Sequence, residues 1–240
     1  MGDTRLYKSG NIHDSSQASE YSQTHELPHR FLAYRDLSAM LKRAPPIVRA
    51  LDLGCGTGFS THYLAQMGLE AIGVDQSPAM VAAAQQNFPE IPFFTTEDTK
   101  NLEPFDLVFS SFVLFELSSK QEIISYLNTA ANSLKEGGLF LAITGSENLH
   151  RKDRDWMCFY VDYDENTNPQ SGDTVKLGLF HPNMEFYDYY WKESDYKSCF
   201  KASNLKLLRV DYPLGLKEDP YEWRDELSIA PFAIFLARKT

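Results

Sequence analysis

The chain has 240 residues, of which 43% are hydrophobic, and this length predicts one sizeable core with an added lid rather than two equal domains. Its formal net charge of −10 disfavours nucleic acid as the main substrate, because phosphate binding requires a basic surface. We expect a cytoplasmic protein without a membrane partner, since no apolar run approaches the roughly 18 residues that span a bilayer and the polar N-terminus lacks a signal-peptide centre.

The first predicted elements are a tail and two helices. Residues 1–16 are polar and aperiodic, so we expect a flexible tail there and a single folded domain over residues 17–240. A helical pattern begins at Gln17, and a second one follows Pro28. The pair Pro45-Pro46 ends the second helix.

Strands and helices then alternate, which predicts a parallel sheet with crossover helices. Apolar runs bounded by turn residues indicate the strands, and amphipathic runs indicate the helices. The predicted strands are 47–53, 70–74, 92–95, 105–110 and 139–144, and the helices between them are 60–67, 78–87 and 120–134.

Residues 146–191 interrupt this alternation, because they are charged and rich in turn residues. We expect this segment to be a lid inserted after the fifth strand. Two of its runs, 175–180 and 184–191, are predicted to pair as an antiparallel flap. The remaining predicted elements are a helix at 194–202 and strands at 205–210 and 232–237, which bring the sheet to seven strands.

The most informative motif is Asp52-x-Gly54-x-Gly56-x-Gly58, between the first predicted strand and the next helix. Glycine allows the backbone to turn sharply and to approach a ligand that a Cβ would block. A dinucleotide fingerprint needs its third glycine at position 59, and a phosphate loop needs Gly-Lys-Ser/Thr where this chain has Gly-Phe-Ser. NAD, FAD and a phosphate loop are therefore disfavoured, and a structural turn without ligand is the remaining alternative.

The motif resembles the first motif of the class I S-adenosylmethionine (SAM)-dependent methyltransferases, in which this loop underlies the methionine part of the cofactor. Four later segments support the resemblance: Asp75 after the second strand, Glu97-Asp98 after the third, Ser110-Ser111 at the end of the fourth, and a double glycine before the fifth. Together they cover residues 47–144, and the resemblance is closest to the small-molecule (type 11) branch.

The resemblance implies an α/β fold, namely a Rossmann-like, mostly parallel, seven-stranded sheet of order 3-2-1-4-5-7-6 flanked by helices. It also implies N-terminal helices, a lid after strand 5, and SAM as cofactor. The residues that would contact the cofactor are Asp52, Gly54, Cys55, Gly56, Gly58, Asp75, Gln76, Met80, Asp98, Thr99 and Ser110.

Three of these residues have specific expected roles and alternatives. Asp75 lies where doubly wound nucleotide-binding folds place an acid against ribose hydroxyls, although capping of the next helix is an alternative. On the resemblance, Met80 would flank the adenine, with core packing as its alternative. Asp98 would accept a hydrogen bond from the adenine amino group, unless this charged segment is a solvated loop.

The methyl acceptor is expected at the carboxyl ends of the strands, where open α/β sheets bind ligands. Positioning does most of the work in such a transfer, because alignment supplies effective molarities of roughly 10⁵–10⁸ M. The loop after the fourth strand has Phe115 and Glu116 near the place where many small-molecule methyltransferases have a histidine. Glu116 is expected to bind a cationic amine or accept a proton, with a surface helix cap as the alternative.

The lid and the first helix supply the other acceptor residues. Alternation along the second flap strand places Phe186, Asp188 and Tyr190 on one face, which either meets the acceptor or packs on the core. Trp156 belongs to a second aromatic cluster with the same two interpretations. Tyr21 resembles the tyrosine of the family's N-terminal helix that closes over cofactor or acceptor. We therefore predict Glu116 and Tyr21 as catalytic residues, and Phe115, Asp188, Tyr190 and Trp156 as substrate-pocket residues.

The sequence thus predicts a SAM-dependent methyltransferase that transfers a methyl group to nitrogen or oxygen of a small molecule by in-line displacement. The alternatives are methylation of a protein or a tRNA, aminopropyl transfer, and a SAM-binding regulatory protein without transfer activity. The acidity of the chain counts against tRNA. No metal site is predicted, because the cysteines and histidines lack ligand spacing.

Overall fold

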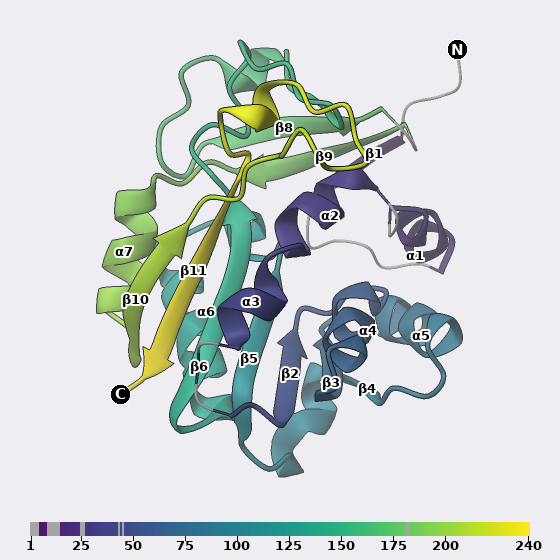
Figure 1. Cartoon of the computed structure of the whole chain (residues 1–240), viewed down its shortest axis with the longest axis vertical. Helices are drawn as coiled ribbons and strands as arrows, with labels where there is room; N and C mark the ends of the chain where they lie inside the picture. The colour runs from purple at the N-terminus through teal and green to yellow at the C-terminus, as the bar shows by residue number, and fades with distance from the viewer. Residues whose placement is uncertain (1–4, 9–14, 25–26, 43, 45, 181–182) are drawn as a thin grey trace.

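The computed structural model describes residues 5–8, 15–24, 27–42, 44, 46–180 and 183–240. Its central element is a seven-stranded sheet in the order β4-β3-β2-β5-β6-β11-β10 (Figure 1). The strands are β2 (Arg49–Leu53), β3 (Glu70–Asp75), β4 (Phe93–Thr95), β5 (Phe105–Ser111), β6 (Leu134–Gly145), β10 (Leu205–Asp211) and β11 (Phe232–Lys239). Only β11 is antiparallel to its neighbours. Numbered along the chain, this is the order 3-2-1-4-5-7-6, so the predicted Rossmann-like topology is confirmed.

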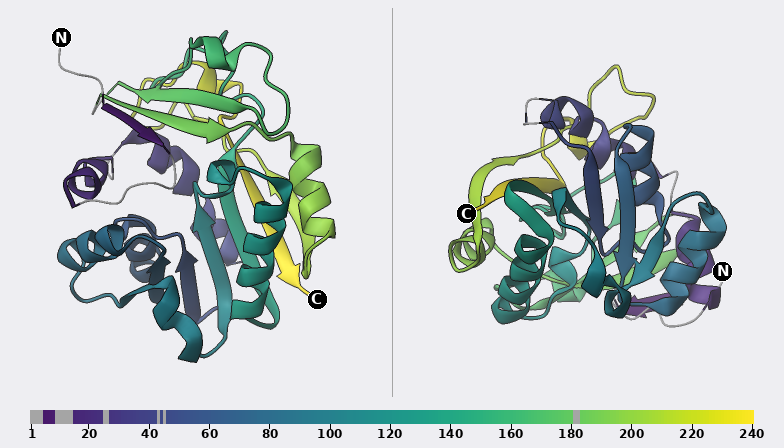
Figure 2. Two further views of the ribbon diagram at one scale, coloured as in Figure 1. Left: turned by 180° about the vertical axis from the view of Figure 1, so that it is seen from behind. Right: turned by 90° about the horizontal axis from the view of Figure 1, so that it is seen from below.

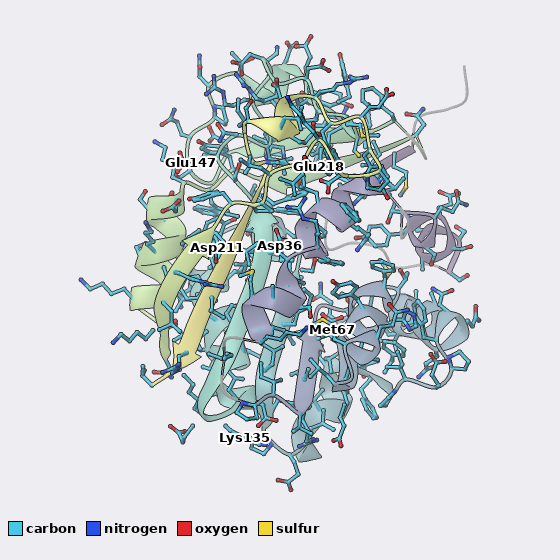
Figure 3. All side chains as sticks on the ribbon, in the orientation of Figure 1. Asp36, Met67, Lys135, Glu147, Asp211 and Glu218 are labelled. Atoms are coloured by element: carbon cyan, nitrogen blue, oxygen red, sulfur yellow. The ribbon has the colours of Figure 1, made fainter. Side chains whose placement is uncertain are left out.

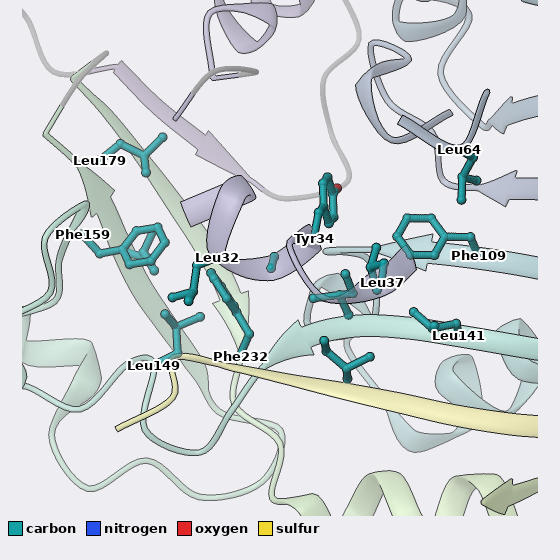
Figure 4. Packing of buried hydrophobic residues seen from close by; sticks show 14 of the residues in the cluster. Leu32, Tyr34, Leu37, Leu64, Phe109, Leu141, Leu149, Phe159, Leu179 and Phe232 are labelled. Carbon is teal, nitrogen blue, oxygen red and sulfur yellow. The ribbon is translucent and has the colours of Figure 1, made fainter. Parts of the chain in front are cut away.

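Helices cover both faces of this sheet. They are α1 (Ser15–Ser22), α2 (Pro28–Tyr34), α3 (Leu37–Leu41), α4 (Phe59–Gln66), α5 (Pro78–Asn87), α6 (Lys120–Ser133) and α7 (Glu193–Lys201). Because side chains alternate across a strand, Phe109 and Leu141 join the buried cluster of α2, α3 and α4 (Figure 4), whereas Val108 and Phe140 join that of α6 and α7. The view from behind in Figure 2 shows α6 and α7 in front of the sheet. Within the described ranges, none of the helices is both long and apolar enough to cross a membrane.

The carboxyl ends of the parallel strands point toward the lid. Lys135, near the start of β6, and Glu147, just beyond its end, lie at opposite ends of the molecule (Figure 3). The other parallel strands run in the same direction as β6. A ligand at these strand ends would therefore lie between the sheet and the lid.

The lid contains a second sheet, in the order β1-β9-β8-β7. Its strands are β1 (Arg5–Lys8), β7 (Phe159–Tyr160), β8 (Thr174–Leu179) and β9 (Met184–Tyr189). The pairing of β8 with β9 is antiparallel, which confirms the predicted flap. However, β9 ends at Tyr189 rather than at Trp191, so the predicted alternation does not extend to the last two residues.

The predicted tail of residues 1–16 is partly wrong. Residues 5–8 form β1, which pairs in parallel with β9, and α1 already begins at Ser15. The partner strand lies almost 180 residues away in the chain, so the local polar composition could not indicate this pairing. Residues 1–4 and 9–14 lie outside the described residues.

The connection between β10 and β11, residues 212–231, packs against the N-terminal helices and the lid. Arg35, at the end of α2, forms an ion pair with Asp219 at 2.8 Å. The buried Glu226 accepts a hydrogen bond from the Met157 backbone N–H at 2.7 Å. This connection, to which the sequence pattern assigned no role, therefore ties α2 and the lid to the core sheet.

Candidate active site

A cavity of about 800 Å³ lies between the carboxyl ends of the strands and the lid. We call the part next to the glycine motif the loop end; its wall residues are Gly54, Gly56, Asp75, Gln76, Ser77 and Met80. We call the part next to the lid sheet the lid end; its wall residues include His29, Phe112, Phe115, Glu116, Phe186 and Asp188. The cavity thus brings together predicted residues from both the glycine motif and the lid.

The glycine motif forms a tight turn that is bonded to the neighbouring strand. The backbone N–H groups of Gly54 and Cys55 both donate to the Val74 carbonyl, at 2.8 and 3.0 Å. Gly54, Gly56 and Gly58 all have positive φ, at 79°, 51° and 91°, a conformation that side chains disfavour. The positive φ angles are by themselves enough to favour glycine at these three positions.

The three glycines differ in what a side chain would meet. A Cβ at Gly56 would have only Tyr21 within 4 Å, at 3.8 Å, so the backbone there is open toward the cavity. A Cβ at Gly58 would lie 2.8 Å from Phe93 and 3.0 Å from Ala84. Gly58 therefore allows α4, α5 and β4 to pack closely, and it does not belong to the cavity wall.

Asp75 lies at the junction between the glycine motif and α5. Its Oδ2 accepts the Gly56 N–H at 2.8 Å, and its Oδ1 accepts the Ser77 N–H at 2.9 Å. Ser77 caps α5 by accepting the Met80 N–H, so the capping role considered for Asp75 belongs to Ser77. Burial raises the pKa of Asp75, and the backbone hydrogen bonds oppose that effect.

Asp52 supports the loop from behind rather than lining the cavity. It is fully buried, and its Oδ2 accepts hydrogen bonds from the Ser60 and Thr61 hydroxyls, both at 2.6 Å. Its Oδ1 is buried without a hydrogen-bond partner. Burial raises the pKa of Asp52 to about 6, against the effect of the two hydroxyls. Asp52 therefore joins β2 to the start of α4.

Three further predicted cofactor residues also lie outside the cavity wall. Cys55 is buried, and burial raises the pKa of its thiol well above the ordinary value. Ser110 is buried and shares a 2.7 Å hydrogen bond with the hydroxyl of Tyr126, which does line the cavity. Thr99 donates to the Thr96 carbonyl within the short 3₁₀ helix η1 (Thr96–Asn101). The side chain of Asp98, in the same helix, lies outside the described residues.

Arg30, on α2, is a buried cation in the cavity wall, 6% exposed. Its guanidinium donates to the Thr24 carbonyl at 3.1 Å and to the Tyr21 hydroxyl at 3.3 Å. It also lies 5.3 Å from the ring centroid of Phe59 and 5.7 Å from that of Phe112. Within the described residues it has no carboxylate partner, although a buried charge normally needs one. From the sequence, Arg30 is a candidate partner for the methionine carboxylate or for an acidic acceptor, with an exposed surface position as the alternative.

The predicted catalytic residue Tyr21 connects the two ends of the cavity. Its hydroxyl accepts the hydrogen bond from Arg30, and its ring meets Phe186 of the lid edge-on, with centroids 6.3 Å apart. Burial raises the pKa of Tyr21, and the Arg30 charge opposes this. Its phenol therefore stays protonated near neutral pH and is able to act as a hydrogen-bond group.

Aromatic rings line much of the lid end. Phe112 follows β5 and stacks on Phe115 of the neighbouring 3₁₀ helix η2 (Leu114–Glu116), with centroids 6.2 Å apart. Phe112 has a φ of 62°, which is strained for a bulky residue and is a feature that occurs at functional sites. Phe159, Phe186 and Phe232 complete an apolar wall that would exclude water.

Glu116, predicted as catalytic, is the half-buried residue at the end of η2. Within the described residues its carboxyl group has neither a hydrogen bond nor an ion pair. Burial raises its pKa well above the ordinary value, and the charges of Asp188 and Asp75 add to this effect. Asp188 is 3% exposed, lines the same cavity and accepts a hydrogen bond from His150 Nε2 at 3.1 Å.

His29 brings an imidazole into the cavity wall from α2, although the loop after β5 has none. Its ring packs against Phe159 and Phe112, with centroids 5.3 and 6.0 Å away. Burial lowers its pKa well below the ordinary value, and the Arg30 charge adds to this, so the ring is neutral at pH 7. Its Nδ1 is buried without a partner.

Two predicted pocket residues do not line the cavity, and these predictions are wrong. Trp156 is fully buried and donates from Nε1 to the Leu149 carbonyl at 2.8 Å, so it is a core residue. Tyr190 follows the end of β9, where its N–H and carbonyl bond to Asp173 and Gly172. Its side chain lines a separate hollow of about 550 Å³ that also contains Glu147.

Comparison with known proteins gives consistent matches. Residues 50–138 match the family model described as a methyltransferase domain. A protein named an uncharacterized methyltransferase from Synechocystis sp. is 37% identical over 109 residues, which cover 44% of this chain and 49% of that protein. A trans-aconitate 2-methyltransferase from Methylobacterium nodulans is 38% identical over 119 residues, covering 48% and 44%. The chain spans about half the length of these curated relatives.

Solved structures match over most of the chain. A SAM-dependent methyltransferase from Clostridium acetobutylicum has a TM-score of 0.62 at 17% identity, covering 93% of this chain and 98% of that one. One from Mesorhizobium loti has a TM-score of 0.59 at 18% identity, covering 85% and 97%. At these identities the likeness establishes the fold, including the lid region outside the family match.

Proposed function

We propose that the protein transfers a methyl group from SAM to a nitrogen or oxygen of a small molecule. The match of residues 50–138 to a methyltransferase domain and the fold shared with SAM-dependent methyltransferases support this proposal. The observation that carries this proposal is the position of Asp75 and the glycine motif. The Asp75 carboxylate is fixed by two backbone N–H groups at the edge of a cavity. A carboxylate has about four acceptor sites, so Asp75 keeps acceptor capacity for a ribose hydroxyl of SAM.

Other residues of the loop end also fit the parts of SAM. The open backbone at Gly56 leaves room for the methionine part. Arg30, a buried cation without a carboxylate partner among the described residues, matches the methionine carboxylate. Met80 and Gln76 line the wall beyond Asp75, where they would flank the adenine. When bound, SAM supplies a methyl group on a positively charged sulfur, and its loss leaves a neutral thioether.

The residues of the lid end would position the acceptor and handle its proton. The aromatic wall of Phe112, Phe115 and Phe186 would orient an apolar body and exclude water. Burial raises the pKa of Glu116, which suits this carboxyl group to accept a proton, and the neutral ring of His29 offers a nitrogen that can accept a hydrogen bond. A transfer that depends on alignment needs no further covalent chemistry from the protein.

The cavity favours a small acceptor over a protein or a tRNA. Donor and acceptor would share about 800 Å³ beneath the lid, within the size range of small-molecule sites. The net charge of −10 further disfavours a polyanion.

Titration calorimetry with SAM and with its product S-adenosylhomocysteine tests this proposal. We expect both to bind, and Asp75→Ala to weaken binding by about 100-fold, or about 2.7 kcal/mol. Asp106→Ala is the matched control, because Asp106 also accepts two backbone N–H groups, from Val48 and Arg49, but at the opposite end of the sheet near Lys135. That variant should bind both compounds normally.

Transfer of labelled methyl from SAM into a pool of small metabolites then tests the reaction itself. Label is expected in one amine or hydroxyl compound. Absence of SAM binding, or equal losses in the Asp75 and Asp106 variants, would contradict the proposal. Label in protein or tRNA alone would replace the small-molecule acceptor with a macromolecule.

A further inference from the structure

The lid end of the cavity contains two carboxyl groups, and one of them, that of Glu116, has no partner among the described residues. Glu116 and Asp188 both line the cavity wall, one from η2 and the other from β9. Glu116 has no hydrogen-bond or ion-pair partner among the described residues, and Asp188 is bonded to His150. A half-buried carboxylate without a partner is costly, so its retention here indicates a ligand that supplies one.

The groups around Glu116 do not provide that partner. After burial, the largest influences on its pKa are the charges of Asp188 and Asp75, and both disfavour ionisation. The phenols of Tyr21 and Tyr126 are close enough for the Glu116 charge to raise their own pKa values. None of these neighbours carries a positive charge. A bound cation would therefore reduce the repulsion between the Glu116 carboxylate and the other two carboxylates, and it would give Glu116 an ion-pair partner.

Arg30 does not fill this role. Its guanidinium is bonded to the carbonyl and hydroxyl of Thr24 and to the Tyr21 hydroxyl. Its charge influences Asp52 behind the glycine motif, whereas it is absent from the main influences on Glu116. Arg30 is therefore held by Thr24 and Tyr21, and it is not a partner of the Glu116 carboxyl group.

The rest of the lid end suits an organic ammonium group. The rings of Phe112, Phe115 and Phe186 line the same cavity, and a cation is attracted to aromatic faces. His29 also lines it, 8% exposed, with a neutral ring whose Nδ1 has no partner. A neutral imidazole adds an acceptor without repelling a cation. This unpartnered nitrogen is a second observation, independent of the carboxylates, that points to a hydrogen-bonding ligand.

Building on the proposed function, we propose that the methyl acceptor is a small amine, bound as its ammonium form by Glu116 beside Asp188 and held within the aromatic wall. Glu116 takes one proton from the ammonium, which frees the nitrogen lone pair. That pair forms the new nitrogen–carbon bond while the carbon–sulfur pair stays on the donor sulfur, so the positive charge moves from sulfur to nitrogen. Glu116 thus serves as both anchor and base.

Three probes of nearly equal shape test this inference: phenethylamine, 2-phenylethanol and 3-phenylpropanoate, each titrated into protein saturated with S-adenosylhomocysteine. We expect the amine to bind at least 10-fold more tightly than the alcohol, and the acid to bind most weakly. Glu116→Gln should remove the preference for the amine, whereas Glu116→Asp should retain most of it. Glu185→Gln is the control, because Glu185 lies on β9, the strand of Asp188, but pairs with Lys176 outside the cavity wall.

A second measurement separates an anchoring role from a merely structural one. Burial raises the pKa of Glu116, and a bound ammonium group would favour the ionised carboxylate, so binding of the amine should shift this group toward proton release. Calorimetry of phenethylamine in two buffers of different ionisation enthalpy should therefore show proton release in the wild type and none in Glu116→Gln.

The possible outcomes distinguish this inference from the proposed function. If S-adenosylhomocysteine binds but the alcohol or the acid binds as tightly as the amine, the amine acceptor is wrong and the methyltransferase proposal stands. The amine acceptor is also wrong, and the methyltransferase proposal again stands, if no probe binds or if Glu116→Gln leaves the amine affinity unchanged. If S-adenosylhomocysteine itself fails to bind, the proposed function falls first.

Discussion

The two ends of the cavity are built in different ways. The loop end comes from one continuous stretch, residues 54–80, and its main polar group, Asp75, is fixed by backbone N–H groups of that stretch. The lid end is assembled from α2, η2, β8, β9 and the start of β11, which are far apart in the sequence. The difference implies that donor binding is a local property of the fold, whereas acceptor choice depends on how separate segments come together.

The loop end should respond most strongly to a change in backbone packing. Gly58→Ala would place a Cβ 2.8 Å from Phe93 at a φ of 91°. We expect the free energy of unfolding to fall by about 3–4 kcal/mol, from the sum of left-handed strain and overpacking. Urea denaturation measures this.

Gly68→Ala is the matched control, because Gly68 has a similar φ of 87° but nothing within 4 Å of its Cβ position. This substitution should lower the free energy of unfolding by only about 1–2 kcal/mol, because it adds the strain of the left-handed backbone conformation and no overpacking. Equal losses in the two variants would mean that Gly58 is required for its conformation and not for the contact of α4, α5 and β4.

The next largest effect concerns the pH dependence of stability. The pKa of Asp52 is about 6 in the folded protein, above its ordinary 3.8, so the folded state binds more protons between pH 4 and 6. The contribution of Asp52 to the free energy of unfolding is therefore present at low pH and is lost as the pH rises from 4 to 6. Relative to Asp52→Asn, the wild type should lose on the order of 2–3 kcal/mol between pH 4 and 7.

Asp106→Asn checks the sign of this effect. Burial alone would raise the pKa of Asp106, but hydrogen bonds from Arg49, Lys135 and Val48 lower it overall. Its contribution to stability should therefore be present above pH 4 and decline as pH falls. If the stability difference between wild type and Asp52→Asn is constant from pH 4 to 7, Asp52 is not protonated in the folded state.

Much of the loop end could be predicted from the sequence because its signals are local. Alternation of strands and helices predicted a parallel sheet, the family resemblance implied its strand order, and the spacing of Gly54, Gly56 and Asp75 located the cavity edge. However, these local signals did not distinguish the residues that line the cavity from the residues that pack behind its wall. Asp52 and Gly58 belong to the same motif, yet both act behind the wall, because that distinction depends on which neighbours pack against them.

The lid end was harder to predict because its contacts are long-range. Arg30 and His29 lie on the short helix α2, and their burial comes from residues far along the chain, such as Phe112 beside Arg30 and Phe159 beside His29. Tyr190 lies just beyond the end of β9, so the predicted strand alternation does not apply to it. Glu116 and Asp188 were found because each follows or lies on a strand that the pattern did identify.

Arg30, between the two ends, should affect binding more than stability. Arg30→Met removes a buried charge that lacks a carboxylate partner among the described residues, so the free energy of unfolding should change by less than about 1 kcal/mol. Affinity for S-adenosylhomocysteine should fall by about 10–100-fold, or about 1.4–2.7 kcal/mol. Calorimetry and urea denaturation measure the two quantities.

Arg35→Met is the control, because Arg35 follows the same helix but is paired with Asp219 at 2.8 Å, away from the cavity wall. It should lose stability without losing affinity. If Arg30→Met instead destabilises the protein and leaves affinity unchanged, Arg30 serves to hold Tyr21 and Thr24 in place.

The smallest expected effect distinguishes the cavity from the neighbouring hollow. Tyr190→Phe removes a hydroxyl from the hollow that Glu147 also lines, so the acceptor KM should change by less than about 2-fold. Phe186→Leu removes a ring that lines the cavity and meets Tyr21 edge-on, a type of contact worth about 0.5–1.5 kcal/mol, so the acceptor KM should rise by about 3–10-fold. Initial rates with the acceptor isolated by label transfer measure both. A larger effect of Tyr190→Phe would place the acceptor in the hollow. The acceptor site would then lie within the lid and apart from the cavity that contains the local donor site.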